Sequence, residues 1–403
     1  MKKFALIFIT VVLLGCREEE PSLTESFFKI YDNSDFDLSY DPIDVVELND
    51  GYIVITGTQR NTTDFQGVQI IKIDLEGEFV GDTELNDYVA PAGDIYFNTD
   101  DSVTYFFTAN PTTLGAVLIG VDTELDVVTE TPLGGINYPL ASNVTSSGNL
   151  LLMSYDPVNL NTQISEISTT GNFVGGANFS IGAGNTINAE QIIIDHFTVV
   201  SEQELPFFCG EFSPGNYYFN GFYEFSFSLV FTDLSSITGQ VQGQSINEGV
   251  REALNAGIRA VLPLSGSDFA VAGFQFSENF QLSSATLTTT GISSSADLFP
   301  DDRRELRPYT PSKIIAYTFG ETNYTIFASE TEGRQIILYF YDVTTGEIAG
   351  IHNIGFINPF TLSSMKITED NSLLVLGTTF VAGRFERMML TKISERQIGD
   401  ILN

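Results

Sequence analysis

Asp50-Gly51-Tyr52-Ile53-Val54-Ile55-Thr56-Gly57 decides the fold, because the same pattern returns along the chain. The pattern is a polar turn followed by an apolar strand that ends in a small residue. Two other clear copies run over residues 371–377 (NSLLVLG) and 267–273 (SDFAVAG). Weaker copies place the small residue at Ala109, Ser154, Gly210 and Ala328. A repeat of this kind is typical of a fold that uses one structural unit many times.

A second apolar strand follows each copy after a polar loop of variable length. These second strands are expected at residues 69–74, 117–122, 164–168, 228–233, 284–288, 338–342 and 388–394. The seven units lie roughly 45 to 60 residues apart, which matches the size of a propeller blade. Their β-branched, aromatic and almost continuously apolar strands favour burial between neighbouring blades. We therefore predict an all-β fold, a β-propeller of seven blades, with a β-sandwich pair or a solenoid as the alternative.

The two ends of the chain predict how the ring closes. The last unit has little sequence left after Ser394 for an outer strand, whereas residues 27–31 (FFKIY) form a strand candidate before the first unit. An unpaired sheet edge exposes a row of backbone hydrogen-bonding groups. We predict that residues 27–31 supply the outer strand of the last blade and bury Phe27 or Phe28.

The first fifteen residues have the layout of a signal peptide. Lys2 and Lys3 precede an apolar run at residues 4–14, and small Gly15 precedes Cys16. The run is too short to span about 30 Å of hydrocarbon. Residues 13–16 (LLGC) resemble the lipobox of bacterial lipoproteins, which implies a lipid on Cys16 that anchors the chain to a membrane. The alternative is an ordinary signal peptide that contains a cysteine.

The segment after Cys16 is a short acidic tether. Arg17, Glu18, Glu19 and Glu20 resemble the export signal that sends lipoproteins of Bacteroidota to the outer face of the outer membrane. The alternative is a merely solvated tether. Residues 27–78 also resemble repeats of exported propeller proteins of Bacteroidota, a likeness that concerns blade architecture and no activity. The expected organisation is a signal peptide at 1–15, a tether at 16–25 and a single propeller domain at 26–403.

The formal net charge of −34 limits the kinds of partner that the chain is expected to bind. Nucleic acid is not an expected partner, because phosphate binding needs clustered Lys and Arg. Charge of this size keeps an exported domain soluble. Cys209 is the only cysteine besides Cys16, so no intramolecular disulfide is possible if Cys16 is acylated.

Two insertions, at about 234–258 and 293–311, interrupt the repeat. In the first, residues 245–248 (SINE) have capping-box spacing and predict a helix that ends at Gly257, either a lid or partner-docking element or a connector packed over a blade. The second contains Arg303, Arg304 and Arg307, which suit a carboxylate, a sulfated sugar or an acidic partner. The alternative is that these arginines pair with the surrounding acids.

The fourth unit adds an aromatic-rich segment at residues 216–223. Tyr217 and Tyr218 are candidate contacts to a sugar ring or a protein partner, with packing inside the blade as the alternative.

No catalytic constellation is apparent in the sequence. His196 and His352 lack metal-ligand spacing, there is no G-x-S-x-G elbow with a credible triad, and Cys209 lies in an apolar segment where it acts as a small hydrophobe. We expect no catalytic residue, metal or cofactor. Calcium binding by Asp32, Asp35 and Asp37 together with Asp100 and Asp101 is an alternative.

The leading hypothesis is a surface-anchored, non-enzymatic binding or accessory lipoprotein of the outer membrane. It would present its propeller to a protein partner in that membrane or to a glycan. The alternative is an extracellular polysaccharide hydrolase or lyase that uses paired carboxylates, since 52 acids leave many pairs open. The absence of Trp, a common platform for sugars, weakens that alternative.

Overall fold

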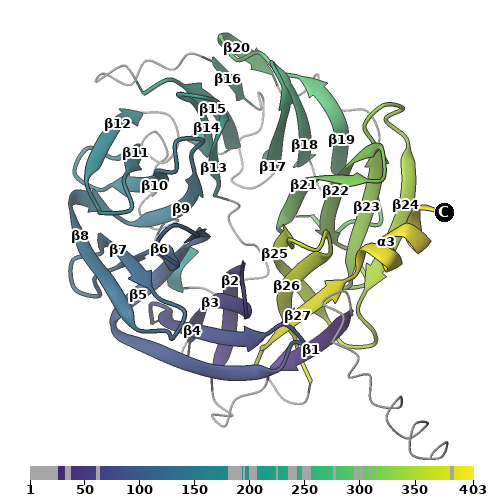
Figure 1. Cartoon of the computed structure of the whole chain (residues 1–403). Helices are drawn as coiled ribbons and strands as arrows, with labels where there is room; N and C mark the ends of the chain where they lie inside the picture. Colours follow the sequence, from purple (N-terminus) through teal and green to yellow (C-terminus); the bar gives the residue numbers. More distant parts are fainter. Residues whose placement is uncertain are drawn as a thin grey trace, which may run out of the picture.

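The computed structural model describes residues 26–31, 38–59, 64–179, 193, 196–198, 207–223, 226–234, 243–246, 256–275, 278–294, 298, 303–308, 310–381 and 385–403. The predicted signal peptide and tether, with Cys16 and residues 17–20, lie outside these ranges. The described strands form a β-propeller, in which successive antiparallel sheets stand around one axis (Figure 1).

The strands follow one another around the ring in sequence order. The first sheet contains β2 (Ser39–Leu48), β3 (Gly51–Gln59), β4 (Gly67–Asp74), β5 (Phe79–Asn98), β6 (Val103–Ala109), β7 (Gly115–Val121) and β8 (Val127–Asn137). The next contains β9 (Pro139–Val144), β10 (Leu150–Asp156), β11 (Asn161–Ile167) and β12 (Phe173–Phe179). The third contains β13 (Cys209–Ser213), β14 (Asn216–Tyr223), β15 (Ser226–Thr232), β16 (Gly243–Ile246), β17 (Ala256–Ser265), β18 (Asp268–Gln275), β19 (Glu278–Thr286) and β20 (Gly291–Ser294).

Two four-stranded sheets complete the ring. One contains β21 (Ser312–Phe319), β22 (Thr322–Glu330), β23 (Ile336–Asp342) and β24 (Ile348–Ile354). The other joins β25 (Phe360–Ile367), β26 (Leu373–Thr379) and β27 (Arg387–Ile393) to β1 (Phe27–Tyr31). The number of seven blades stays a prediction, because β5 runs for twenty residues from one blade into the next and the two larger sheets continue beyond a single blade.

The antiparallel pairing gives each blade two distinct sides. In the first blade, Leu48 pairs with Gly51 and Gly51 with Asp74, at the end where short turns join the strands. We call this end the turn side. Tyr40 pairs with Thr58 at the opposite end, where longer connections lie, and we call it the loop side. These two sides are used below to describe where the chain end and the candidate site lie.

Six of the seven repeated apolar strands lie next to the innermost strand of their blades and are buried, as predicted, whereas the copy that ends at Gly210 falls in β13, an innermost strand. Every residue of β26 is buried, as is nearly every residue of β3. The small residue at the end of the repeat has a local cause. A Cβ atom on Gly377 would lie 1.9 Å from the backbone oxygen of Thr361 on the neighbouring strand, so only glycine fits. In the fifth unit, β19 begins earlier than the predicted 284–288.

The first and last blades pack face to face, which holds the ring together. Tyr52, Val54 and Ile71 of the first blade share a buried apolar cluster with Leu374 and Leu390 of the last. All five side chains are at most 2% exposed. Contact between blades that are more than 300 residues apart in the chain is the packing expected of a closed ring.

The predicted ring closure is confirmed. β1 pairs antiparallel with β27 over five residues, from Phe27 opposite Lys392 to Tyr31 opposite Met388, and Figure 1 shows purple β1 beside yellow β27. Phe27 and Phe28 are half-buried rather than fully buried, because β1 is an outermost strand. The Phe27 ring lies 6.2 Å from that of Tyr52, and the Tyr31 hydroxyl donates to the backbone oxygen of Gly77 at 2.9 Å.

The helix predicted between residues 245 and 257 is wrong where the structure describes it. Ser245 and Ile246 belong to β16, and Gly257 belongs to β17, while 247–255 lie outside the described residues. β16 pairs with β15 and β20, and this strand pairing prevails over the local capping pattern.

A helix occurs instead at the end of the chain. α3 (Glu395–Leu402) begins after Ser394, whose hydroxyl accepts from the backbone N–H of Gln397. Residues 394–397 (SERQ) thus have the spacing of a capping box in the sequence. Within the described residues, no helix has the length and apolar character needed to cross a membrane.

Candidate functional site

A cavity of about 360 Å³ lies at the centre of the ring. Its walls come from the innermost strands of successive blades: β2, β5, β9, β13, β17, β21 and β25. The lining includes Phe207 and Phe208 before β13 and the first residues of β21, so the cavity lies toward the loop side. Its size is that of a small-molecule site.

An ion pair between the first and last blades crosses the wall of the cavity. Asp44 on β2 is fully buried, and its carboxylate lies 2.9 Å from the Lys366 Nζ on β25. Asp44 also accepts from the hydroxyl of Ser364 and, at 2.9 Å, from the backbone N–H of Ile95. Burial alone would lower the pKa of Lys366, but the charges of Asp44 and Asp94 outweigh burial and raise it above the ordinary value. Lys366 is therefore charged at neutral pH.

Arg259 occupies another part of the wall and is 3% exposed. Its guanidinium donates to the backbone oxygen of Thr310 at 2.6 Å and to the side-chain oxygen of Asn279 at 2.8 Å. The Asn279 amide in turn donates to the backbone oxygen of Leu306 at 2.7 Å. Burial lowers the pKa of Arg259 to about 10, so it stays charged and ties the segment after β20 to β17.

The three predicted arginines lie near this segment but do not form one group. The Arg303 guanidinium donates to the Tyr341 hydroxyl at 3.0 Å and lies over the ring of Tyr339. Arg307 is 3.8 Å from the carboxylate of Glu330, and Arg304 is exposed. Arg307 therefore pairs with an acid, as in the alternative, whereas the contacts of Arg303 described here are with tyrosines.

The two predicted tyrosines point to opposite sides of β14. Tyr217 is buried, and its hydroxyl donates to Glu166 at 3.1 Å. Tyr218 is also buried but lines the central cavity. Of the five candidate contact residues, Tyr218 alone reaches the cavity.

Two residues singled out in the sequence also line the cavity. His196 stands edge-on to Phe197 and Phe207, and burial lowers its pKa to about 4, so the ring is neutral at pH 7. Cys209 is buried, and burial raises the pKa of its thiol well above the ordinary value. A thiol in this state is a poor nucleophile.

Sequence reasoning missed Asp41, Asp94, Arg259, Lys313 and Lys366, which line the cavity, and Asp44, which pairs with Lys366. A signal for two of them was present, because Asp44 and Lys366 interrupt the apolar segments 43–46 (IDVV) and 365–367 (MKI). A charge inside a buried strand calls for a partner.

The acids proposed for calcium are only partly described. Asp32, Asp35 and Asp37 lie outside the described residues. Asp101 accepts from the backbone N–H of Val103 and the hydroxyl of Tyr105 in the turn after β5. The described part of the chain contains no cluster of three or more His, Cys, Asp or Glu side chains arranged to hold a metal ion.

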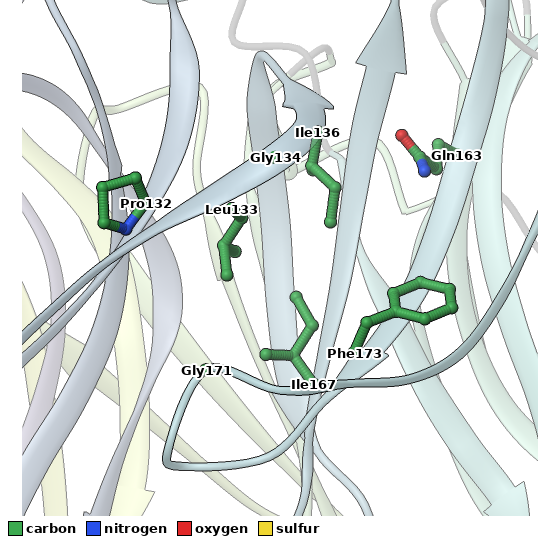
Figure 2. A pocket seen from close by; sticks show the side chains of 8 residues that line it. All are labelled: Pro132, Leu133, Gly134, Ile136, Gln163, Ile167, Gly171 and Phe173. Carbon is green, nitrogen blue, oxygen red and sulfur yellow. The ribbon is translucent and has the colours of Figure 1, made fainter.

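A second hollow of about 350 Å³ lies between β8, β11 and β12 (Figure 2). Leu133, Ile136, Ile167 and Phe173 line it, and Gln163 supplies the polar side chain. The site is less suited to a specific ligand than the central cavity, because polar groups that converge on one point are needed to orient a bound molecule.

Comparison with known proteins assigns the chain to no family and to no activity. No family model and no curated protein matches the chain. The β-propeller domain of the Trilobed protease from Pyrococcus furiosus is 10% identical, with 90% of this chain and 98% of that chain covered and a TM-score of 0.45. Virginiamycin B lyase from Staphylococcus aureus is 10% identical, with 92% and 100% covered and a TM-score of 0.49. A protein of unknown function from Bacteroides caccae is 9% identical, with 87% and 92% covered and a TM-score of 0.39.

Proposed function

We propose that this chain is a lipid-anchored, non-enzymatic propeller on the outer face of the outer membrane, which binds a glycan or a protein partner at its loop side. The position of the chain end carries the proposal. The Ser26 hydroxyl accepts from the backbone N–H of Ser394, which follows β27 on the turn side. A tether from Cys16 therefore reaches the domain on the side opposite the cavity, and the loop side faces away from the membrane.

The length of the tether agrees with this orientation. The ten residues from Cys16 to Ser26 span at most about 35 Å when fully extended. This reach holds the turn side near the bilayer and leaves the cavity open to large molecules outside the cell. Co-purification from detergent-solubilised membranes tests for a stable partner. A chain that elutes alone and binds no surface glycan would contradict the proposal.

Replacement of Cys16 by alanine tests the anchor. We expect Cys16→Ala to move the protein from the membrane fraction to the soluble fraction, because the lipid supplies the membrane affinity. Cys209→Ala is the matched control and should leave the protein in the membrane fraction. Full membrane partitioning of the Cys16 variant after signal cleavage would contradict the anchor.

Replacement of the acidic cluster tests surface exposure. With Glu18, Glu19 and Glu20 changed to alanine, we expect the lipid anchor to persist but the protein to stay on the periplasmic leaflet. Protease added to whole cells should then spare it while digesting the wild type. Equal digestion of both would remove the export-signal interpretation. Alanine at Glu76 and Glu78, acids in a turn of the domain, provides a control for the loss of charge.

The enzymatic alternative depends on a carboxyl group that can donate a proton. Burial raises the pKa of Glu330 to about 7, which suits a general acid. However, Glu330 is 2% exposed, and its carboxylate accepts from the backbone N–H of Leu362 at 3.1 Å. A substrate does not reach this group in the described arrangement, so Glu330 does not favour a hydrolase or lyase.

A further inference from the structure

Lys313 differs from the other cations of the central cavity. It lies near the start of β21, is half-buried and lines the cavity. Within the part of the chain that the structure describes, its ammonium has no ion pair and no side-chain hydrogen bond. The chain holds 52 acids against 18 Lys and Arg, so a half-buried lysine without a carboxylate partner is unexpected. Removing a charge from water without compensation costs free energy, which a bound anion would recover.

The remaining cations of the cavity are already used by the fold. Lys366 is paired with Asp44, and Arg259 donates to backbone oxygens and to Asn279. Asp41 is compensated as well, because burial raises its pKa toward the neutral form and the Gln66 amide donates to it. Among the described cations that line the cavity, Lys313 is therefore the one available to bind a ligand.

The rest of the lining indicates what the ligand carries besides its negative charge. Phe207 and Phe208 supply half-buried aromatic rings, which pack against the C–H face of a sugar. Asp94 is 39% exposed and only loosely held, 3.9 Å from Lys366, so its carboxylate is free to accept from hydroxyl groups. One lysine in a cavity that Asp94 also lines favours a singly charged carboxylate over a phosphate, since Asp94 would repel a dianion.

We propose that the central cavity binds a sugar acid, with the sugar carboxylate on Lys313, its hydroxyls near Asp94 and its ring against Phe207 and Phe208. The inference deepens the function proposed above by naming the ligand class of the same site. About 360 Å³ accommodates a ligand of one or two rings, the end of an acidic glycan rather than a long segment of it.

Calorimetric titration of the full chain in detergent micelles with galacturonate and glucuronate tests the inference, with galactose and glucose as neutral probes. We expect at least one of the acids to bind about tenfold more tightly than its neutral counterpart, because a charge-assisted contact contributes about 1.4 kcal/mol or more. Lys313→Met should lose this difference, and Lys313→Arg should retain most of it. Lys29→Met is the matched control, since Lys29 is paired with Glu78 on the outer strand β1.

Unchanged binding of the acid to Lys313→Met, in a variant with the wild-type melting temperature, would overturn the inference. So would the failure of both acids to bind the wild type at about 50 mM, far above the useful range for a specific site. If Lys313→Met does not fold, loss of the acid preference in Lys313→Gln serves instead. The two proposals can fail separately. If the chain binds the acid but is not on the cell surface, only the proposed function is contradicted. If the chain has a surface partner but does not bind the acid, only this inference is contradicted.

Discussion

Removal of residues 17–32 is expected to unfold or aggregate the domain, whereas removal of residues 17–25 should leave its melting temperature nearly unchanged. The longer deletion takes away β1, which leaves backbone groups of the buried strand β27, from Met388 to Lys392, without their partners. Buried backbone groups left unpaired cost about 1 to 3 kcal/mol each. Loss of the half-buried Phe27 adds about 2 kcal/mol. Together these costs rival the whole stability of an ordinary domain, about 5 to 15 kcal/mol.

Thermal melts followed by circular dichroism distinguish the two truncations. Single substitutions refine the result: Phe27→Ala should lower the melting temperature by several degrees. Phe173→Ala is the matched control, because Phe173 begins the outer strand β12 and is 62% exposed. Equal melting temperatures for both truncations would show that pairing of β1 with β27 contributes nothing to stability.

The second large effect is expected from Lys366→Met. This change leaves the fully buried carboxylate of Asp44 without its cation, and breaking a buried pair in this way costs about 3 to 5 kcal/mol. Asp44→Asn should cost less, because the Lys366 side chain is 31% exposed and water replaces part of the lost interaction. The double variant should be more stable than Lys366→Met alone.

Urea denaturation measures these differences, with Lys29→Met as the exposed-pair control at about 0 to 1 kcal/mol. The pH dependence has a definite sign. The pKa of Lys366 is raised in the folded protein, so the contribution of the pair is complete at neutral pH and is lost only as the pH rises above the ordinary lysine range. A gap between wild type and Lys366→Met that closes below pH 9 would contradict the pairing.

The repeat could be predicted from the sequence because its signal is local and recurs. A polar turn, a run of β-branched residues and a terminal small residue all lie within eight positions, as in residues 50–57. The closing strand β1 could be predicted for a different reason, since a ring with a missing outer strand leaves a sheet edge to cover.

Helices were harder to place because one local pattern occurs in two environments. Residues 245–248 and 394–397 both have capping-box spacing. At the first, β16 pairs with β15 and β20, and strand pairing prevails. At the second, Ile401 packs on Gly350 and Gly399 lies against Phe319, and a helix forms. Tertiary contacts decide between strand and helix at these two places, and local helix propensity does not predict such contacts.

The candidate site was out of reach for the same reason. Ser364 and Asp44 are hydrogen-bonded although 320 residues separate them. The spacing of residues along the chain does not predict a contact between residues so far apart. The arginines and tyrosines stood out because they cluster in sequence, whereas Lys313 stands out only once the inner strands surround one cavity.

The strand pairing at the junction of the chain ends also determines how the molecule bears tension. In the arrangement proposed above, a pull between an anchor at the turn side and a partner at the loop side would run along β1. Its five residue pairs with β27 are then loaded in parallel, in shear, and must fail together rather than open one after another like a zipper. A domain tethered in this way resists fluid drag most strongly along the direction in which a surface ligand would pull it.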